Sequence, residues 1–124
     1  MDRLSHPDAA LVQRRCSEWL GLALRARRLA VGSDAVLAAV RSRKARLVVL
    51  AADAGERAKK QFRDKCAFYH IPLFEVLNRG DLGRAIGRSE VVAVAVTDPG
   101  FAAKLRELLG EIDGGEAFDK TPRV

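Results

Sequence analysis

Two short runs of uninterrupted apolar residues constrain this chain more than any other feature. LVVL at 47–50 and VVAVAV at 91–96 contain no polar residue. Successive side chains of a strand point to opposite faces of a sheet, so a strand of this kind has to be covered on both faces. Helical patterns precede and follow both runs. The sequence therefore predicts a sheet between two layers of helices.

The remaining segments alternate between helical and extended patterns. We predict helices over about 8–28, 33–43, 54–70, 80–87 and 98–112, and strands at 29–31, 47–50, 71–77 and 91–96. Asp98 and Pro99 are typical of a helix start. The expected fold is α/β, a three-layer α/β/α sandwich with a small mixed four-stranded sheet. It forms a single domain over 1–112, and 113–124 is expected to be a flexible acidic tail.

The distribution of charge indicates a polyanionic partner. The net charge is +6, and residues 25–88 hold fifteen Lys or Arg against six Asp or Glu, whereas residues 89–124 hold four against seven. A concentrated basic surface favours nucleic acid or an anionic membrane. The alternative is a solvated basic surface that serves solubility. Without a signal-peptide pattern or a run of about 20 apolar residues, we expect a cytoplasmic protein.

Residues that could support catalysis each have a simpler role. Cys16 and Cys66 lie in helical patterns and are expected to be buried, reduced thiols. His70 is expected to cap a helix end. Asp53 follows a strand, where α/β enzymes often keep an acid, but we favour a cap on the following helix. We find no nucleotide loop, nucleophile–base pair or metal-ligand spacing, so we expect no catalytic residue, metal or cofactor.

The segment RRLAVGSD at 27–34 combines cations with a helix start. Arg27 and Arg28 precede Gly32, and a helix begins directly after the glycine. The first amides of a helix are unpaired, and glycine lets a ligand approach them closely. We therefore predict an anion site in which the two arginines grip phosphate beside these amides. The alternative is a plain helix cap beside solvated arginines.

Three longer stretches carry a resemblance to a known family. They are LGLALRARRLAVGSDAVLAAVRSRKARLVVLAADAG, DKCAFYHIPLFEV and DLGRAIGRSEVVAVAVTDPGFA. In order and spacing the chain resembles, over about residues 17–109, the archaeal and eukaryotic ribosomal-protein family that binds kink-turn RNA, and most of all its short bacterial YlxQ-type branch. The resemblance implies an α/β/α fold without catalysis. It also implies binding to a helix–internal loop–helix RNA bent at tandem sheared G·A pairs.

The resemblance also indicates which residues face RNA. The family's first turn reads G-x-N-E with a Lys three residues later, and here Gly32, Ser33, Asp34, Ala35 and Ala38 hold those positions. An ionised Asp34 can accept but cannot donate a hydrogen bond. The second RNA-facing loop corresponds to residues 88–91. The predicted RNA surface is Arg27, Arg28, Gly32, Ser33, Asp34, Arg41, Arg84, Arg88, Ser89 and Glu90.

The expected partner is structured RNA, either ribosomal RNA or another kink-turn RNA. Phosphate contacts position a protein and base contacts specify, so the chain is expected to bind RNA with strong salt dependence and reduced selectivity. We expect a monomer that associates with the ribosome, without DNA specificity or membrane contact. The alternative is a protein–protein adaptor for an RNA-modifying enzyme or a ribonucleoprotein. A small-molecule enzyme on the same sheet is a third reading.

Overall fold

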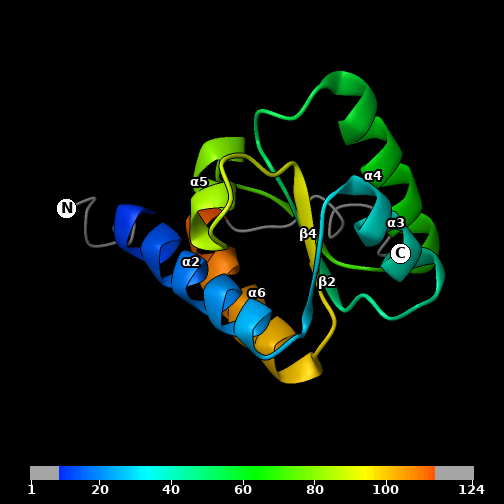
Figure 1. Ribbon diagram of the computed structural model, residues 1–124. Coiled ribbons are helices and arrows are strands. Elements are labelled where there is room, and N and C mark those ends of the chain that lie inside the picture. The colour runs from blue at the N-terminus through cyan, green and yellow to red at the C-terminus, as the bar shows by residue number, and fades with distance from the viewer. Residues whose placement is uncertain (1–8, 114–124) are drawn as a thin grey trace.

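The computed structural model describes residues 9–113, and their side chains through residue 110. Helices and strands alternate along the chain as the sequence predicts (Figure 1). The elements are α2 (Ala9–Arg25), β1 (Leu29–Val31), α3 (Ser33–Arg41), β2 (Leu47–Leu50), α4 (Glu56–Tyr69), β3 (Leu73–Glu75), α5 (Arg79–Ala85), β4 (Ala93–Val96) and α6 (Pro99–Asp113).

The sheet has four strands in the order β1-β4-β2-β3. Strand β4 runs antiparallel to both of its neighbours, with Val94 opposite Val31 on β1 and opposite Val49 on β2. Strands β2 and β3 are parallel, with Val49 opposite Phe74. This arrangement confirms the predicted small mixed sheet.

Helices cover both faces of the sheet (Figure 1). Side chains on the central strands alternate between two apolar clusters, as strand geometry requires. Leu47 and Val49 join the cluster under α2, α5 and α6. Val48 and Leu50 join the cluster under α3 and α4. All four side chains are buried, so the predicted three-layer α/β/α sandwich is confirmed.

The strands β3 and β4 are shorter than predicted. β4 begins at Ala93 rather than at residue 91, because the Val91 amide donates to the Arg79 carbonyl at 3.1 Å and not to a strand. β3 ends at Glu75, and Leu77 turns the chain with a φ of 59°. Most of the predicted flexible tail, 113–124, lies outside the described residues.

Candidate nucleic-acid interface

The turn between β1 and α3 presents bare backbone, as the sequence predicts. Gly32 has a φ of 97°, a conformation that glycine adopts without steric cost, and a Cβ at this position would meet open space. Helix α3 begins at Ser33, and no described side chain accepts a hydrogen bond from its first amides. Three donors at a positive helix end can therefore bind an anion. Asp34 lies in the same first turn and opposes an anion there.

The loop between α5 and β4 lies beside this turn. The Gly32 amide donates to the Ala93 carbonyl at 3.0 Å, three residues after Glu90. The loop is held against α5 because Gly83 has no side chain: a Cβ there would lie 2.8 Å from the Arg88 carbonyl oxygen and 2.9 Å from the Glu90 amide nitrogen. We call Gly32, Ser33 and Asp34 together with residues 87–92 the glycine end.

The glycine end brings together six of the predicted RNA-binding residues. They are Gly32, Ser33, Asp34, Arg88, Ser89 and Glu90, of which all but the partly buried Gly32 are exposed. Their charged members are one arginine and two acids, so this surface does not carry the positive charge that the composition led us to expect there.

The predicted pair Arg27 and Arg28 does not lie at the glycine end. The Arg28 carbonyl accepts from the Thr97 amide at 2.9 Å, at the end of β1 opposite to Gly32. Because β1 is extended, about 13 Å of backbone separates the Cα atoms of Arg28 and Gly32. The expectation that the arginine pair grips a phosphate beside the helix start is therefore wrong. In Figure 1, α2 passes into β1 at the lower end of the sheet, and α3 starts at its upper end.

The predicted Arg41 lies at this opposite end as well. It is the last residue of α3, and the chain then returns to β2, where the Arg46 amide donates to the Val96 carbonyl at 2.7 Å. The end of helix α4 is also near, as the Arg43 guanidinium lies 5.1 Å from the centre of the ring of Tyr69, the last residue of α4. We call the surface formed by Arg27, Arg28, Arg41, Arg43, Lys44, Arg46, Phe68, Tyr69 and His70 the arginine end.

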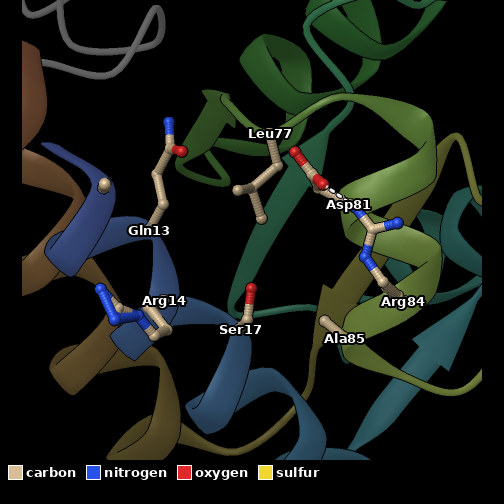
Figure 2. Close-up of a pocket in the computed structure, with 8 residues that line it drawn as sticks. Gln13, Arg14, Ser17, Leu77, Asp81, Arg84 and Ala85 are labelled. Carbon is tan, nitrogen blue, oxygen red and sulfur yellow. Dashed lines mark hydrogen bonds and ion pairs between the residues drawn. The ribbon is translucent and has the colours of Figure 1, made fainter.

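The last predicted residue, Arg84, points into a groove between α2 and α5. The groove has a volume of about 420 Å³, and Figure 2 shows Gln13 and Ser17 of α2 on one side of it and Asp81, Arg84 and Ala85 of α5 on the other. There Arg84 makes an ion pair with Asp81, which offsets its charge. Arg84 is therefore neither a free cation nor part of the turn at Gly32.

Asp53 bonds to the start of a different helix from the one that we predicted, namely α5, whose N-cap residue is Asn78. Gly55 is the N-cap of α4 and makes no side-chain cap, whereas Asp53 Oδ1 accepts from the Arg79 amide, at the first residue of α5, at 2.9 Å. Asp53 Oδ2 also lies 3.6 Å from Arg79 Nε. The carboxylate is thus used in structure, since it fixes the chain entering the helix that supports the glycine end.

The two cysteines are free and buried, as predicted. Burial raises the pKa of the Cys66 thiol to about 12, which keeps it protonated and a poor nucleophile. His70 is the exposed C-cap residue of α4, as predicted. Within residues 9–113 no group of three or more His, Cys, Asp or Glu is placed to hold a metal ion. No helix in this described part is long and apolar enough to cross a membrane.

The residues that complete the arginine end were not among the predicted RNA-binding residues. Arg43, Lys44 and Arg46 belong to the run RSRKAR at 41–46, which is a visible signal of positive charge. Phe68 and Tyr69 carry no such signal, because an aromatic pair at the end of a helical pattern is usually assigned to the core.

Comparisons with known proteins agree with the fold and the resemblance. The profile of the ribosomal protein L7Ae/L30e/S12e/Gadd45 family matches residues 14–106. The RNA-binding protein YlxQ of Bacillus subtilis (strain 168) is 47% identical over 95 residues, which span 74% of this chain and 95% of the relative. The RNA-binding protein YlxQ of Enterococcus faecium is 35% identical over 97 residues, which span 78% of this chain and 93% of the relative.

Two solved structures are similar in three dimensions. A Bacillus halodurans protein described as having unknown function superposes with a TM-score of 0.72 at 46% identity, covering 76% of this chain and 95% of the other. The Giardia lamblia 15.5kD RNA binding protein superposes with a TM-score of 0.69 at 19% identity, covering 82% and 88% of the two chains. The second likeness is one of fold.

Proposed function

The chain belongs to the ribosomal protein L7Ae/L30e/S12e/Gadd45 family, and from this premise we propose that it binds structured RNA of the kink-turn type through its glycine end. Its similarity to the two YlxQ proteins confirms the predicted bacterial branch. Their printed description as RNA-binding proteins supports the general class of ligand. The glycine end supports the choice of surface, because open backbone lies beside an exposed loop.

The observation that carries this proposal is the backbone geometry at Gly32. A phosphate can approach the uncapped amides of Ser33, Asp34 and Ala35, since no Cβ at residue 32 stands in the way. The loop at 88–90 supplies hydroxyl, guanidinium and carboxylate groups next to it. The described residues offer no exposed nucleophile–base pair there, and we propose binding without catalysis.

A comparison of two RNAs tests the proposed function. One is a labelled hairpin with a kink-turn internal loop, and the other has its G·A pairs replaced by Watson–Crick pairs. Tight binding to the first RNA alone supports the proposal. Equal, salt-sensitive binding to both means that phosphate contacts act without recognition of the bend. Binding to neither RNA overturns the proposal and favours the protein-adaptor alternative.

Asp34 offers a sharper test of the same surface. Its carboxylate repels phosphate and cannot donate to a base, whereas an amide can donate. We expect Asp34→Asn to strengthen kink-turn binding about five-fold or more, by analogy with base contacts in DNA recognition. Glu18→Gln on α2 makes the same charge change at an exposed site away from the glycine end and is the matched control. If both variants gained the same affinity for the kink-turn RNA, the gain would come from the change in net charge and not from a contact made by residue 34.

The finer parts of the proposal concern the setting of this binding. We propose a monomer in the cytoplasm that meets ribosomal or other kink-turn RNA. The two buried free thiols are typical of a reducing compartment. Sedimentation of the protein with ribosomes from a lysate, before and after nuclease treatment, tests the association with RNA.

A further inference from the structure

We propose that the arginine end is a second RNA-binding surface, which holds a single-stranded RNA segment independently of the glycine end. The inference rests on the proposed function only in taking RNA as the partner. Its own basis is the juxtaposition of cations that have no acidic partner among the described residues with the exposed Phe68 ring, which packs on the partly buried Tyr69.

The cations of the arginine end are not neutralised. Arg27, Arg28, Arg41, Arg43, Lys44 and Arg46 are all exposed, and none makes an ion pair with any residue in the described part of the chain. The acid in the adjoining turn, Asp98, is half-buried and accepts from the Phe101 amide at 3.0 Å. Elsewhere Lys60, Arg63, Arg79, Arg84 and Lys104 pair with acids. Arg15 and Arg57 make no ion pair among the described residues either, so what distinguishes the arginine end is that six such cations gather there.

Helix dipoles account for only part of this charge. Helices α2, α3 and α4 all end here, and each helix C-terminus carries about half a negative charge, so the three together offset about one and a half of six cations. The remaining excess has no acidic partner among residues 9–110. A polyanion would supply one, with its phosphates following the row of side chains.

Backbone strain at two of these cations supports a function for their side chains. Arg27 has a φ of 62° and Arg43 a φ of 64°, the left-handed conformation that favours glycine at a helix end. Arginine is therefore the less stable choice at both positions. His70 and Leu77 adopt the same conformation, so what distinguishes the two arginines is the charge that each projects from a helix end.

The aromatic pair indicates unpaired bases rather than a uniform polyanion. The side chain of Phe68 is 72% exposed, and its ring meets that of Tyr69 at a centroid distance of 4.9 Å and an interplanar angle of 80°. Arg43 lies over the Tyr69 ring. Aromatic rings beside guanidinium groups are the usual platform on which proteins stack unpaired bases. A duplex would keep its bases away from Phe68, so we assign the ligand as single-stranded RNA.

The two ends are separate enough to act independently. Helix α3 connects them, and its nine residues place Ser33 and Arg41 about 12 Å apart along the axis. A variant at one end can therefore be tested without disturbing the other. An RNA with a folded loop and a single-stranded flank could occupy both.

The experiment uses the full chain and two labelled probes, an oligouridylate and the kink-turn hairpin. We expect Arg43→Gln with Lys44→Gln to weaken oligouridylate binding about ten-fold and to reduce the salt slope by about 1.4, since each phosphate contact with a single strand contributes about 0.7. Phe68→Ala should weaken it about five-fold or more through lost stacking. Arg15→Gln with Arg57→Gln removes the same charge from exposed positions on α2 and α4 and serves as the control.

Each outcome bears on the two proposals differently. If the arginine-end variants bind oligouridylate as tightly as the control variant, the proposal of a second surface is wrong. Unchanged binding to the hairpin in the same variants would leave the proposed function intact. Wild-type protein that binds the hairpin but not oligouridylate overturns the second surface alone. Loss of binding to both probes in the wild type overturns both. Capture by anionic-lipid vesicles without oligouridylate binding would assign the arginine end to membranes and overturn the RNA assignment.

Nuclear magnetic resonance locates the contacts without any substitution. Oligouridylate should shift the ring resonances of Phe68 and Tyr69, and the hairpin should shift the amides of Ser33 and Ser89. Shifts that the oligouridylate produces at Ser33 instead would overturn the second surface. Amide spectra also verify that each variant is folded.

Discussion

The chain leaves helices α2, α3 and α4 through Arg27, Arg43 and His70, which lie just beyond the helix ends in left-handed backbone. At the glycine end, the chain leaves α5 through Gly87 with a φ of 77°. The hydrogen bonds are equivalent: the Arg28 amide donates to the Ala23 carbonyl at 2.8 Å, as the Arg88 amide does to the Gly83 carbonyl. All four helices thus have the same C-terminal motif. The difference lies in the side chain, which projects a cation at one end and leaves open backbone at the other.

Positive charge and backbone access are therefore provided by separate surfaces in this fold. The glycine end exposes the uncapped amides of the first turn of α3, but it carries one arginine against two acids. The arginine end carries six cations that make no ion pair with any described residue, but it has no uncapped helix start of this kind within 9–113. A ligand that needs both has to reach across the length of α3.

The substitution with the largest expected effect breaks the glycine end alone. Gly83→Ala places a Cβ 2.8 Å from the Arg88 carbonyl oxygen, and the loop backbone has to move. We expect a loss of about 3 kcal/mol in the free energy of unfolding, measured by urea denaturation, because the clash is with backbone rather than a flexible side chain. Gly110→Ala on α6 meets nothing within 4 Å and is expected to gain about 0.5–1 kcal/mol. Similar effects in both would remove the special role of Gly83.

High pH provides a way to destabilise the core beneath the arginine end. The Cys66 pKa is about 12 in the folded chain and near 9.0 when exposed, so the unfolded chain releases the proton first. Stability contributed by the neutral thiol is complete below pH 9 and decreases as the pH rises toward 12, by about 1.4 kcal/mol per pH unit. Urea denaturation at pH 8 and pH 10 measures this loss. Between pH 8 and pH 10 the free energy of unfolding of Cys66→Ala should fall by about 1.4 kcal/mol less than that of the wild type. An equal fall in both proteins would contradict the raised pKa of Cys66.

Asp53→Ala tests how the entry to α5 is fixed. The substitution removes the acceptor for the Arg79 amide and the exposed ion pair, and we expect a loss of about 1 kcal/mol in the free energy of unfolding, mainly from the lost hydrogen bond to the amide. Asp53→Asn keeps an oxygen in place and should retain most of this stability. If the two variants were equally destabilised, the ion pair rather than this hydrogen bond would be the main contribution.

Substitutions at Arg27 distinguish the effect of backbone strain from the effect of charge, and they have the smallest expected change in the free energy of unfolding. Arg27→Gly and Arg27→Ala remove the same guanidinium, but only glycine adopts a φ of 62° without cost. We expect the glycine variant to be more stable by about 0.5–1 kcal/mol in urea denaturation, while both weaken oligouridylate binding equally. Equal stabilities would show that this helix end is not strained.

Most of the fold could be predicted from the sequence because its signals are local. The apolar runs at 47–50 and 91–96 identify central strands, and Asp98 with Pro99 marks the start of α6, where Asp98 Oδ2 accepts from the Phe101 amide at 3.0 Å. Each signal involves residues within one turn or one strand. The mixed character of the sheet was predicted, but the strand order was not, since it depends on contacts between distant segments.

The candidate site was predicted only in part, for a geometric reason. The turn at Gly32 follows from a glycine before a helical pattern, and its conformation is confirmed. The arginine pair was misplaced because Arg28 lies only four residues before Gly32 and was therefore expected to be near it. The intervening residues form the extended strand β1, which puts the two at opposite ends of the sheet. Phe68 was missed since its exposure depends on where α4 ends, and Asp53 was assigned to the nearer helix although it bonds to the start of the helix that begins 26 residues later.

The central position of β4 has a consequence for synthesis of the chain. β4 is the last strand to be made, yet it provides the partner of β1 and the second partner of β2. A ribosome that has released only residues before Ala93 therefore exposes two strand edges with no partner in the sheet. At about 5–20 residues per second, the roughly 60 residues between Val31 and Val94 take several seconds to appear. The fold closes only after the C-terminal third emerges, and during that interval the nascent chain is most exposed to wrong pairing.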